Sequence, residues 1–136
     1  MMTAKVIGSC LCQKVRFEVE GSFDAFFLCH CTYCQKDTGS AHAANLFAKG
    51  AKLSWLSGES YTKTFTVPGT RHSKCFCTEC GAALPRSEIG EGMIVLPAGS
   101  IDEGALKQPD AHIMMDSKAN WDDSLDEVVK LDGLPG

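Results

Sequence analysis

Three tight groups of cysteines are the residues of this chain best suited to chemistry. The 136-residue sequence holds eight cysteines, which form one C-x-C pair and two C-x-C-x2-C groups. Thiols one or two residues apart are too close for ordinary structural disulfides, but they can bind a single tetrahedral metal ion together. The groups are Cys10 and Cys12; Cys29, Cys31 and Cys34; and Cys75, Cys77 and Cys80.

The number of sulfurs decides what each metal site could do. Two pairs of thiols close a site with four sulfurs, which stabilises a fold, whereas three thiols leave one coordination position free for a reaction. The sequence therefore predicts one closed and one open site. Spacing alone does not decide which C-x-C-x2-C group is the open one.

The closed site would join distant parts of the chain if Cys10 and Cys12 pair with Cys77 and Cys80. Gly81, directly after Cys80, is typical of a zinc knuckle, where the backbone adopts a conformation that most residues avoid. The backbone amides of such a knuckle can then point at the cysteine sulfurs. Paired spacing favours zinc over the longer cysteine runs of iron–sulfur proteins. The alternative is that Cys10 and Cys12 are small buried apolar residues.

The open site has a simple expected geometry in the group at residues 29–34. On a strand, Cys29 and Cys31 would share one face while His30 points away, and a turn would then bring Cys34 round as the third sulfur. Zinc held by three thiolates accepts a fourth ligand, and a substrate thiol suits so soft a site. Binding would deprotonate that thiol, and the thiolate is the nucleophilic form, able to add to a carbonyl.

Bulk properties exclude several classes of partner. The net charge is -4 and the basic residues are scattered, so no basic stripe suited to nucleic acid is present. Residues 1–9 lack the apolar core of a signal peptide, and no apolar run approaches a membrane span. We therefore expect a cytoplasmic protein, in a reducing compartment where clustered cysteines are ligands or catalysts more often than disulfides.

Apolar residues alternate with polar ones along most of the chain, which predicts an antiparallel all-β domain with little helix. We expect one domain over residues 1–136, with a core at about 8–121 and an acidic tail at 122–136 anchored by Trp121. Helix signals are limited to a turn near Asp102–Leu106 and a capping box at Ser124–Glu127. The expected strands are residues 15–19, 26–31, 43–48, 53–56, 61–67, 94–96 and 112–115.

Motifs along nearly the whole chain resemble the glutathione-dependent formaldehyde-activating enzyme family, which includes centromere protein V-like proteins. The resemblance rests on Gly8–Phe17 (GSCLCQKVRF), Cys29–Lys36 (CHCTYCQK) with the following TGS, and Phe76–Gly81 (FCTECG). It continues in Ala111–Ile113 and in Ser117–Trp121 (SKANW), followed by Asp132–Pro135. Cys75 departs from the family pattern.

The resemblance implies an Mss4-like β fold with two zinc ions. Carried over motif by motif, Cys10, Cys12, Cys77 and Cys80 would be structural ligands, and Cys29, Cys31 and Cys34 would hold a catalytic zinc. The implied activity is the reversible addition of glutathione to formaldehyde, a carbon–sulfur lyase reaction, with a thiol and a small aldehyde as partners. The alternatives are a non-catalytic zinc module that binds glutathione or a protein, and a redox switch.

Other residues have an ordinary role and a functional one to weigh. Cys75 is expected to be a spare packing thiol, with competition for the structural metal or redox sensing as the alternatives. His30 is expected to pack or hydrogen-bond behind the metal strand, and Thr38 and Ser40 to form a turn or to lie beside the open zinc. His42, His72 and His112 are expected to be ordinary surface or core residues. Lys36, Arg71 and Lys118 could bind the carboxylates of glutathione.

Overall fold

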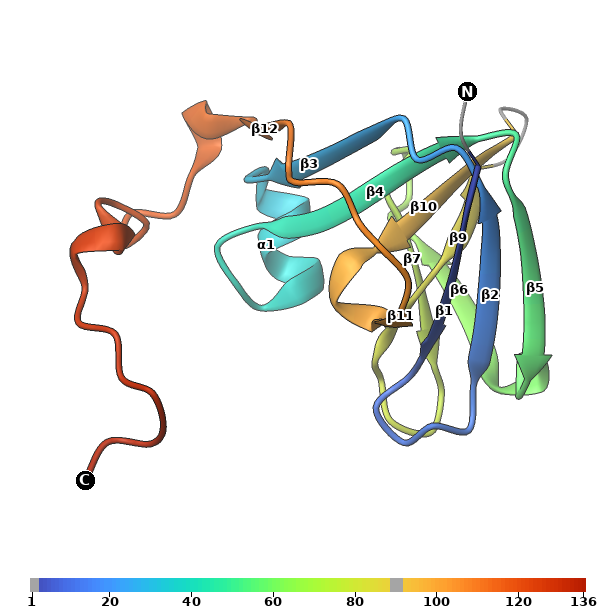
Figure 1. Ribbon diagram of the computed structural model, residues 1–136. Helices are drawn as coiled ribbons and strands as arrows, with labels where there is room; N and C mark the ends of the chain where they lie inside the picture. Colours follow the sequence, from blue (N-terminus) through green and yellow to red (C-terminus); the bar gives the residue numbers. More distant parts are fainter. Residues whose placement is uncertain (1–2, 89–91) are drawn as a thin grey trace.

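The computed structural model describes residues 3–88 and 92–136, which form three β-sheets and, among these residues, one α-helix (Figure 1). Neighbouring strands are antiparallel except for one parallel pair. The prediction of an all-β antiparallel fold with little helix is therefore confirmed. Within the described part of the chain, no helix combines the length and apolar character needed to cross a membrane.

The first sheet shows why alternating sequence forms strands here. In strand β2 (Arg16–Gly21) Phe17 and Val19 are fully buried while Arg16 is exposed to solvent, as the period of two predicts. Gly8 lies opposite Phe17, and a Cβ on Gly8 would stand 2.3 Å from the ring, so only glycine fits. The strand order is β11 (Ile101–Glu103), β1 (Ala4–Ser9), β2 (Arg16–Gly21) and β5 (Lys52–Ser57).

The second sheet carries the cysteine group at residues 29–34 on one end. Strand β3 (Ala25–Cys29) of this sheet ends at Cys29, opposite Ala43 on one side and Ile113 on the other. The pairing with Ile113 is the parallel one, and it brings the C-terminal part of the chain beside this cysteine. The strand order is β12 (Ala111–Ile113), β3 (Ala25–Cys29), β4 (Ala43–Lys49), β10 (Met93–Pro97) and β9 (Arg86–Glu88).

The third sheet is a small one that ends in the last cysteine group. Its order is β6 (Thr62–Thr66), β7 (Ser73–Cys77) and β8 (Ala83–Leu84), so β6 is an edge strand. Cys75 and Cys77 are buried on β7 and join the common hydrophobic core. The core combines side chains from all three sheets, among them Val6, Phe17, Val19, Leu46, Leu84 and Leu96.

In residues 3–88 and 92–136, the helix α1 (Thr32–Thr38) and four 3-10 turns complete the fold. The turns are η1 (Glu59–Tyr61), η2 (Ala98–Ser100), η3 (Met115–Ser117) and η4 (Leu125–Glu127). After η4 the chain runs away from the sheets to the C-terminus (Figure 1).

Several local expectations were wrong. The strand expected over 26–31 ends at Cys29, and Cys31 is the N-cap of the unexpected helix α1. The segment expected to turn helically at 102–106 begins as strand β11 instead. Ser124 makes no side-chain capping bond to η4. Trp121 is 57% exposed, so other residues anchor the tail.

Candidate metal centres

Four cysteine sulfurs from two distant parts of the chain meet in one cluster, which we call the closed cluster: Cys10, Cys12, Cys77 and Cys80. Their Sγ atoms all lie within 4.8 Å of one another. The Cys10–Cys12 sulfur distance is 3.6 Å and the Cys12–Cys77 distance is 3.9 Å. Sulfurs around tetrahedral zinc, bonded at about 2.3 Å, stand about 3.8 Å apart. The four thiols therefore fit a zinc ion.

Two turns with left-handed residues hold these sulfurs. In the first turn Gln13, at φ 66°, follows Cys12, and the Val15 amide donates to Cys10 Sγ at 3.3 Å. In the second, Gly81 has φ 77°, and the Glu79 amide donates to Cys77 Sγ at 3.4 Å. The knuckle expected at Gly81 is thus present. The matching left-handed turn at Gln13 was not predicted, because glutamine seldom adopts that conformation.

Hydrogen bonding within the closed cluster shifts the thiol pKa values apart. Burial opposes ionisation of Cys80, but hydrogen bonds from the Ala82 and Cys12 amides and from the Cys12 and Cys10 thiols lower its pKa to about 6. A backbone hydrogen bond at Lys14 lowers the pKa of Cys12. Burial and hydrogen bonds to the other three thiols outweigh this effect and raise the pKa to about 11. The cluster thus favours at least one thiolate near neutral pH, which suits a cation.

A second group, the open cluster, consists of Cys29, Cys31 and Cys34, and their sulfurs also lie within 4.8 Å of one another. Cys29 ends β3, and Cys31 is the N-cap of α1, where its sulfur accepts from the Cys34 amide at 3.4 Å. The first turn of α1 then places Cys34 beside its cap. The sulfurs converge as expected, but a helix cap brings them together, not a shared strand face.

Three sulfurs are all that the open cluster offers. Among the described residues, no fourth cysteine, histidine or carboxylate joins this group, so one position of a tetrahedral ion would be free. Despite burial, hydrogen bonds from the Cys34 amide and from the Cys34 and Cys29 thiols lower the pKa of Cys31. Burial, followed by hydrogen bonds to Cys29 and Cys31, raises the pKa of Cys34.

His30 lies between Cys29 and Cys31 in the sequence, and its side chain contacts residues outside the open cluster. Its side chain is only 1% exposed. One ring nitrogen, Nε2, is 2.9 Å from His112 Nδ1, and the other, Nδ1, is 3.0 Å from the Asp122 carboxylate. The expectation that His30 hydrogen-bonds behind the cysteines is confirmed, and Asp122 serves as the tail anchor that Trp121 was expected to be.

Sequence analysis missed a histidine cluster and a bridge around this position. His42 joins His30 and His112, with its ring 5.0 Å from His30. Gln35 Nε2 donates to the His30 carbonyl at 2.7 Å and to the Ser117 carbonyl at 2.9 Å. These contacts hold the segment after β12 against the open cluster. No local signal could have revealed the contacts with His112 and Ser117, because each of these residues lies 82 positions from its partner in the sequence.

The remaining candidates have ordinary positions. Thr38 donates to the Cys34 carbonyl at 2.9 Å and closes the end of α1, and the Ser40 amide donates to the Thr38 hydroxyl. His72 pairs with Asp37 at 3.0 Å. Lys36 is exposed on α1. Lys118 lies 3.8 Å from Asp123. Arg71 is exposed.

Cys75 also belongs to neither group of sulfurs. It is buried in the core on β7, and that burial raises the pKa of its thiol. The expectation that Cys75 is a packing residue is therefore confirmed.

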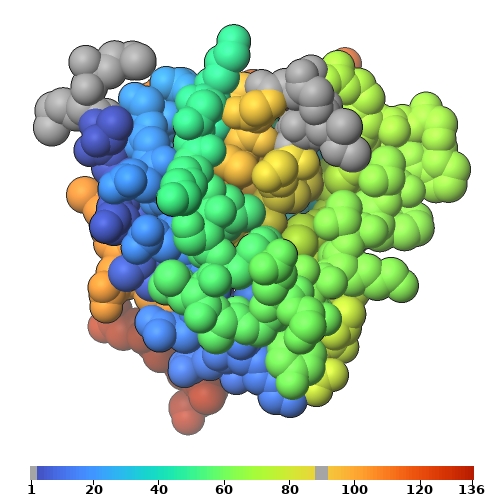
Figure 2. All heavy atoms as spheres, turned by 90° about the vertical axis from the view of Figure 1, so that its right-hand side faces the viewer, coloured from blue at the N-terminus to red at the C-terminus, as the bar shows by residue number. Residues whose placement is uncertain are grey.

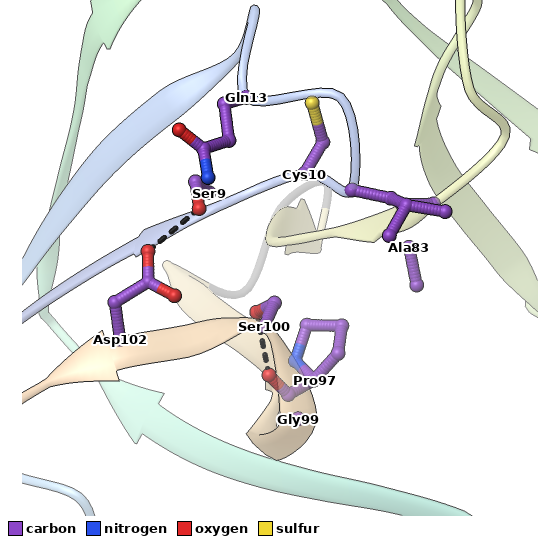
Figure 3. Close-up of a pocket in the computed structure, with 10 residues that line it drawn as sticks. Ser9, Cys10, Gln13, Ala83, Pro97, Gly99, Ser100 and Asp102 are labelled. Atoms are coloured by element: carbon purple, nitrogen blue, oxygen red, sulfur yellow. Dashed lines mark hydrogen bonds between the residues drawn. The ribbon is translucent and has the colours of Figure 1, made fainter.

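A cavity of about 440 Å³ lies beside the closed cluster (Figure 3). Cys10 is part of its wall, and none of the open-cluster cysteines lines it. Two hydrogen bonds lie in its wall: Ser9 donates to Asp102 at 2.6 Å, and Ser100 donates to the Pro97 carbonyl at 2.6 Å. We assign this cavity no role in chemistry at the open cluster.

Comparisons with known proteins agree with this geometry. A search of the curated proteins gave no significant match. Among solved structures, a Rhodobacter sphaeroides protein superposes with a TM-score of 0.60 at 18% sequence identity, over 78% of this chain and 98% of that one. At that identity the likeness concerns the fold alone. The sequence profile described as "Glutathione-dependent formaldehyde-activating enzyme" matches residues 5–117, which include both cysteine clusters. With the profile matching most of its length, the chain belongs to the family of glutathione-dependent formaldehyde-activating enzymes.

Proposed function

We propose that this protein is a zinc-dependent carbon–sulfur lyase that joins a thiol, glutathione or a close relative, reversibly to a small aldehyde such as formaldehyde. The observation that carries the proposal is the open cluster of three converging sulfurs, which the chain has in addition to a complete cluster of four. Family membership supports the choice of thiol and aldehyde.

In this proposal both clusters hold zinc and have different roles. Cys10, Cys12, Cys77 and Cys80 bind a structural ion, and Cys29, Cys31 and Cys34 hold a catalytic one. Zinc bound there would lower the pKa of a thiol in its free position and so provide the nucleophilic thiolate near neutral pH. The overall reaction forms one carbon–sulfur bond and transfers the thiol proton to the aldehyde oxygen.

The residues around the open cluster hold this arrangement in place. The Cys34 amide donates to Cys31 Sγ, which favours the thiolate form of Cys31. Gln35 fixes the backbone of His30 between the two cysteines. We expect this rigid support to keep the three sulfurs preorganised for one ion.

Two lysines give a reason to favour a thiol with carboxylates. Lys36 follows Gln35 on α1, and Lys118 follows Ser117, whose carbonyl accepts from Gln35. The hydrogen bond from Gln35 to Ser117 holds the two segments together near the open cluster, and each segment carries one of the lysines. Glutathione has two carboxylates, and ammonium groups are suitable partners for them. The abundance of free thiols in the chain suits a reducing, cytoplasmic compartment.

Proton exchange spectroscopy of formaldehyde mixed with glutathione tests the proposal. The wild-type protein should increase the exchange rate between free and thiol-bound formaldehyde, and Cys34→Ser should remove the increase. Cys75→Ser is the matched control, because Cys75 lies outside both clusters, and it should retain the wild-type rate.

The second candidate is a non-catalytic zinc module that binds a thiol or a protein. Cys29 and Cys31 are partly exposed, so the open cluster could also capture a thiol without further reaction. An unchanged exchange rate, together with glutathione binding that Cys34→Ser abolishes, would favour the module and contradict the lyase.

A further inference from the structure

The C-terminal segment 123–136, which we call the arm, exposes apolar side chains that a folded chain normally covers. Val129 is 79% exposed, Leu131 is 58% exposed and Leu134 is 94% exposed. Single exposed apolar residues are common on protein surfaces, but a succession of them on one segment marks an interaction site. The arm contains four carboxylates and one lysine: Asp123, Asp126, Glu127, Asp132 and Lys130. It is thus an acidic segment with apolar side chains.

A surface of opposite charge and similar apolar character lies on β6 and β7. Lys63 pairs across the strands with Phe76, and Phe65 pairs with Lys74, so these four side chains form one face of alternating lysine and phenylalanine. On this face the β6 side chains are exposed and the β7 side chains are half-buried. Together with Gly81 they line a shallow groove of about 480 Å³. Phe65 is 55% exposed there. We call this surface the β6–β7 groove.

The groove also borders an unpaired strand edge. Among the described strands β6 pairs with β7 alone, so within this part of the chain the other edge of β6 is open to an added strand. The arm has suitable backbone at Val128, which is extended at φ -72° and ψ 140°. An extended segment with β-branched residues can dock against such an edge and insert alternate side chains into the neighbouring groove.

The arm does not reach this groove within its own chain. It leaves the body on the side of β12 and ends at the lower left of Figure 1, whereas β6 and β7 lie on the right. In Figure 2 the yellow-green atoms of residues 60–76 form the right side of the surface, and the red atoms of the C-terminal segment lie at the lower left. A second copy of the chain has the same arm and the same groove, so a reciprocal exchange closes a two-fold dimer.

We propose that the arm of one chain docks in the β6–β7 groove of a second copy, so that the protein is a dimer held by two exchanged arms. Val129, Leu131 and Leu134 are the apolar contacts of the arm. Phe65 and Phe76 receive them, and Lys63 lies close to the arm's carboxylates. Lys74 contributes less charge, because its ammonium lies 3.1 Å from Asp37.

Analytical ultracentrifugation of the full-length protein tests the exchange. Wild type should sediment at twice the mass of the 14.6 kDa chain. Leu131→Asp damages the arm and Phe65→Asp damages the groove, and each should weaken dimerisation at least tenfold. Leu56→Asp is the matched control: Leu56 is an exposed leucine on β5 that belongs neither to the arm nor to the lining of the groove, and this variant should remain dimeric.

Mixing the two damaged variants distinguishes arm exchange from other dimers. The Leu131→Asp variant keeps an unaltered groove, and the Phe65→Asp variant keeps an unaltered arm. In an equimolar mixture the arm of the second variant should dock in the groove of the first and form a heterodimer through one intact contact, while each variant alone stays monomeric. Circular dichroism checks that both variants are folded. A monomeric wild type, a dimer unaffected by either substitution, or a mixture that does not associate would each overturn the proposal.

Discussion

The two cysteine clusters use similar thiols but differ in how the chain brings them together. The closed cluster joins the turn after β1 to the end of β7, and 65 residues separate Cys12 from Cys77. The open cluster lies within a single segment of six residues, 29–34. A metal ion in the first would stabilise the fold across a long loop, whereas a metal ion in the second would hold little besides its own ligands.

Support from the rest of the protein also differs between the clusters. Backbone amides of two turns donate to the closed cluster, which is therefore built by its own loops. The open cluster has one local amide bond, from Cys34 to Cys31 Sγ, and the distant contacts of His30 and Gln35 with residues 112–122 add to it. This difference indicates that the open cluster can lose metal or be damaged while the fold survives.

The largest expected effect comes from breaking the closed cluster. Cys77→Ser should lower the free energy of unfolding by about 4 kcal/mol, because a clip across a 65-residue loop restricts the unfolded chain by that amount. Thermal unfolding followed by circular dichroism should show a melting temperature lower by about 10 °C or more.

Cys34→Ser is the matched change in the open cluster. It should lower the melting temperature by a few degrees at most, because residues 29–34 close no long loop. Equal losses of stability in the two variants would contradict the division of roles between the clusters.

A smaller effect is expected from Gln35→Ala, which removes two hydrogen bonds between the open cluster and the segment after β12. The two carbonyls lose partly buried partners, so the free energy of unfolding in urea should fall by about 1–3 kcal/mol. Zinc affinity of the open cluster should fall about tenfold, measured by competition with a chromophoric chelator.

Lys36→Ala, at the neighbouring exposed position, is the control for Gln35→Ala and should change neither quantity. If Gln35→Ala lowered stability but left the zinc affinity unchanged, the bridge would be a fold contact without influence on the metal site.

The smallest effect concerns pH and the histidine cluster. Burial, with the charges of His30 and His112, lowers the pKa of His42 below its usual 6.5, and Asp122 only partly opposes this. The unfolded chain then binds a proton at His42 more readily than the folded chain does. The stabilising contribution is therefore fully present above pH 6.5 and is lost as the pH falls towards the lowered value.

His42→Gln should make the stability curve flatter in this pH window. Urea unfolding at several pH values between 7.5 and 5, with excess zinc in every sample, compares the variant with wild type. Curves of identical shape would show that His42 does not titrate differently on folding.

The cysteine ligands could be predicted from sequence because their spacing is local chemistry. Strand β2 was predictable for a similar reason, since Phe17 and Val19 alternate with charged residues. The helix after Cys31 could not be predicted, because seven residues are too few for an apolar period, and its cap is a cysteine and not one of the usual capping residues.

The surroundings of the open cluster depended on long-range packing. His112 and Asp122 reach His30 because β12 pairs in parallel with β3, and no short motif specifies such a pairing. Strand β7 was missed because two of its inward residues are cysteines, Cys75 and Cys77, which were considered as ligands and not as members of an apolar strand face.

Zinc content per chain is the most direct test of the two unequal clusters. Elemental mass spectrometry should be applied to wild type and Cys34→Ser, both purified without chelator or added thiol. We predict two zinc ions in wild type and one in Cys34→Ser, with the fold of the variant intact. A single zinc in wild type that Cys34→Ser leaves unchanged would contradict a metal ion in the open cluster and the chemistry proposed for it.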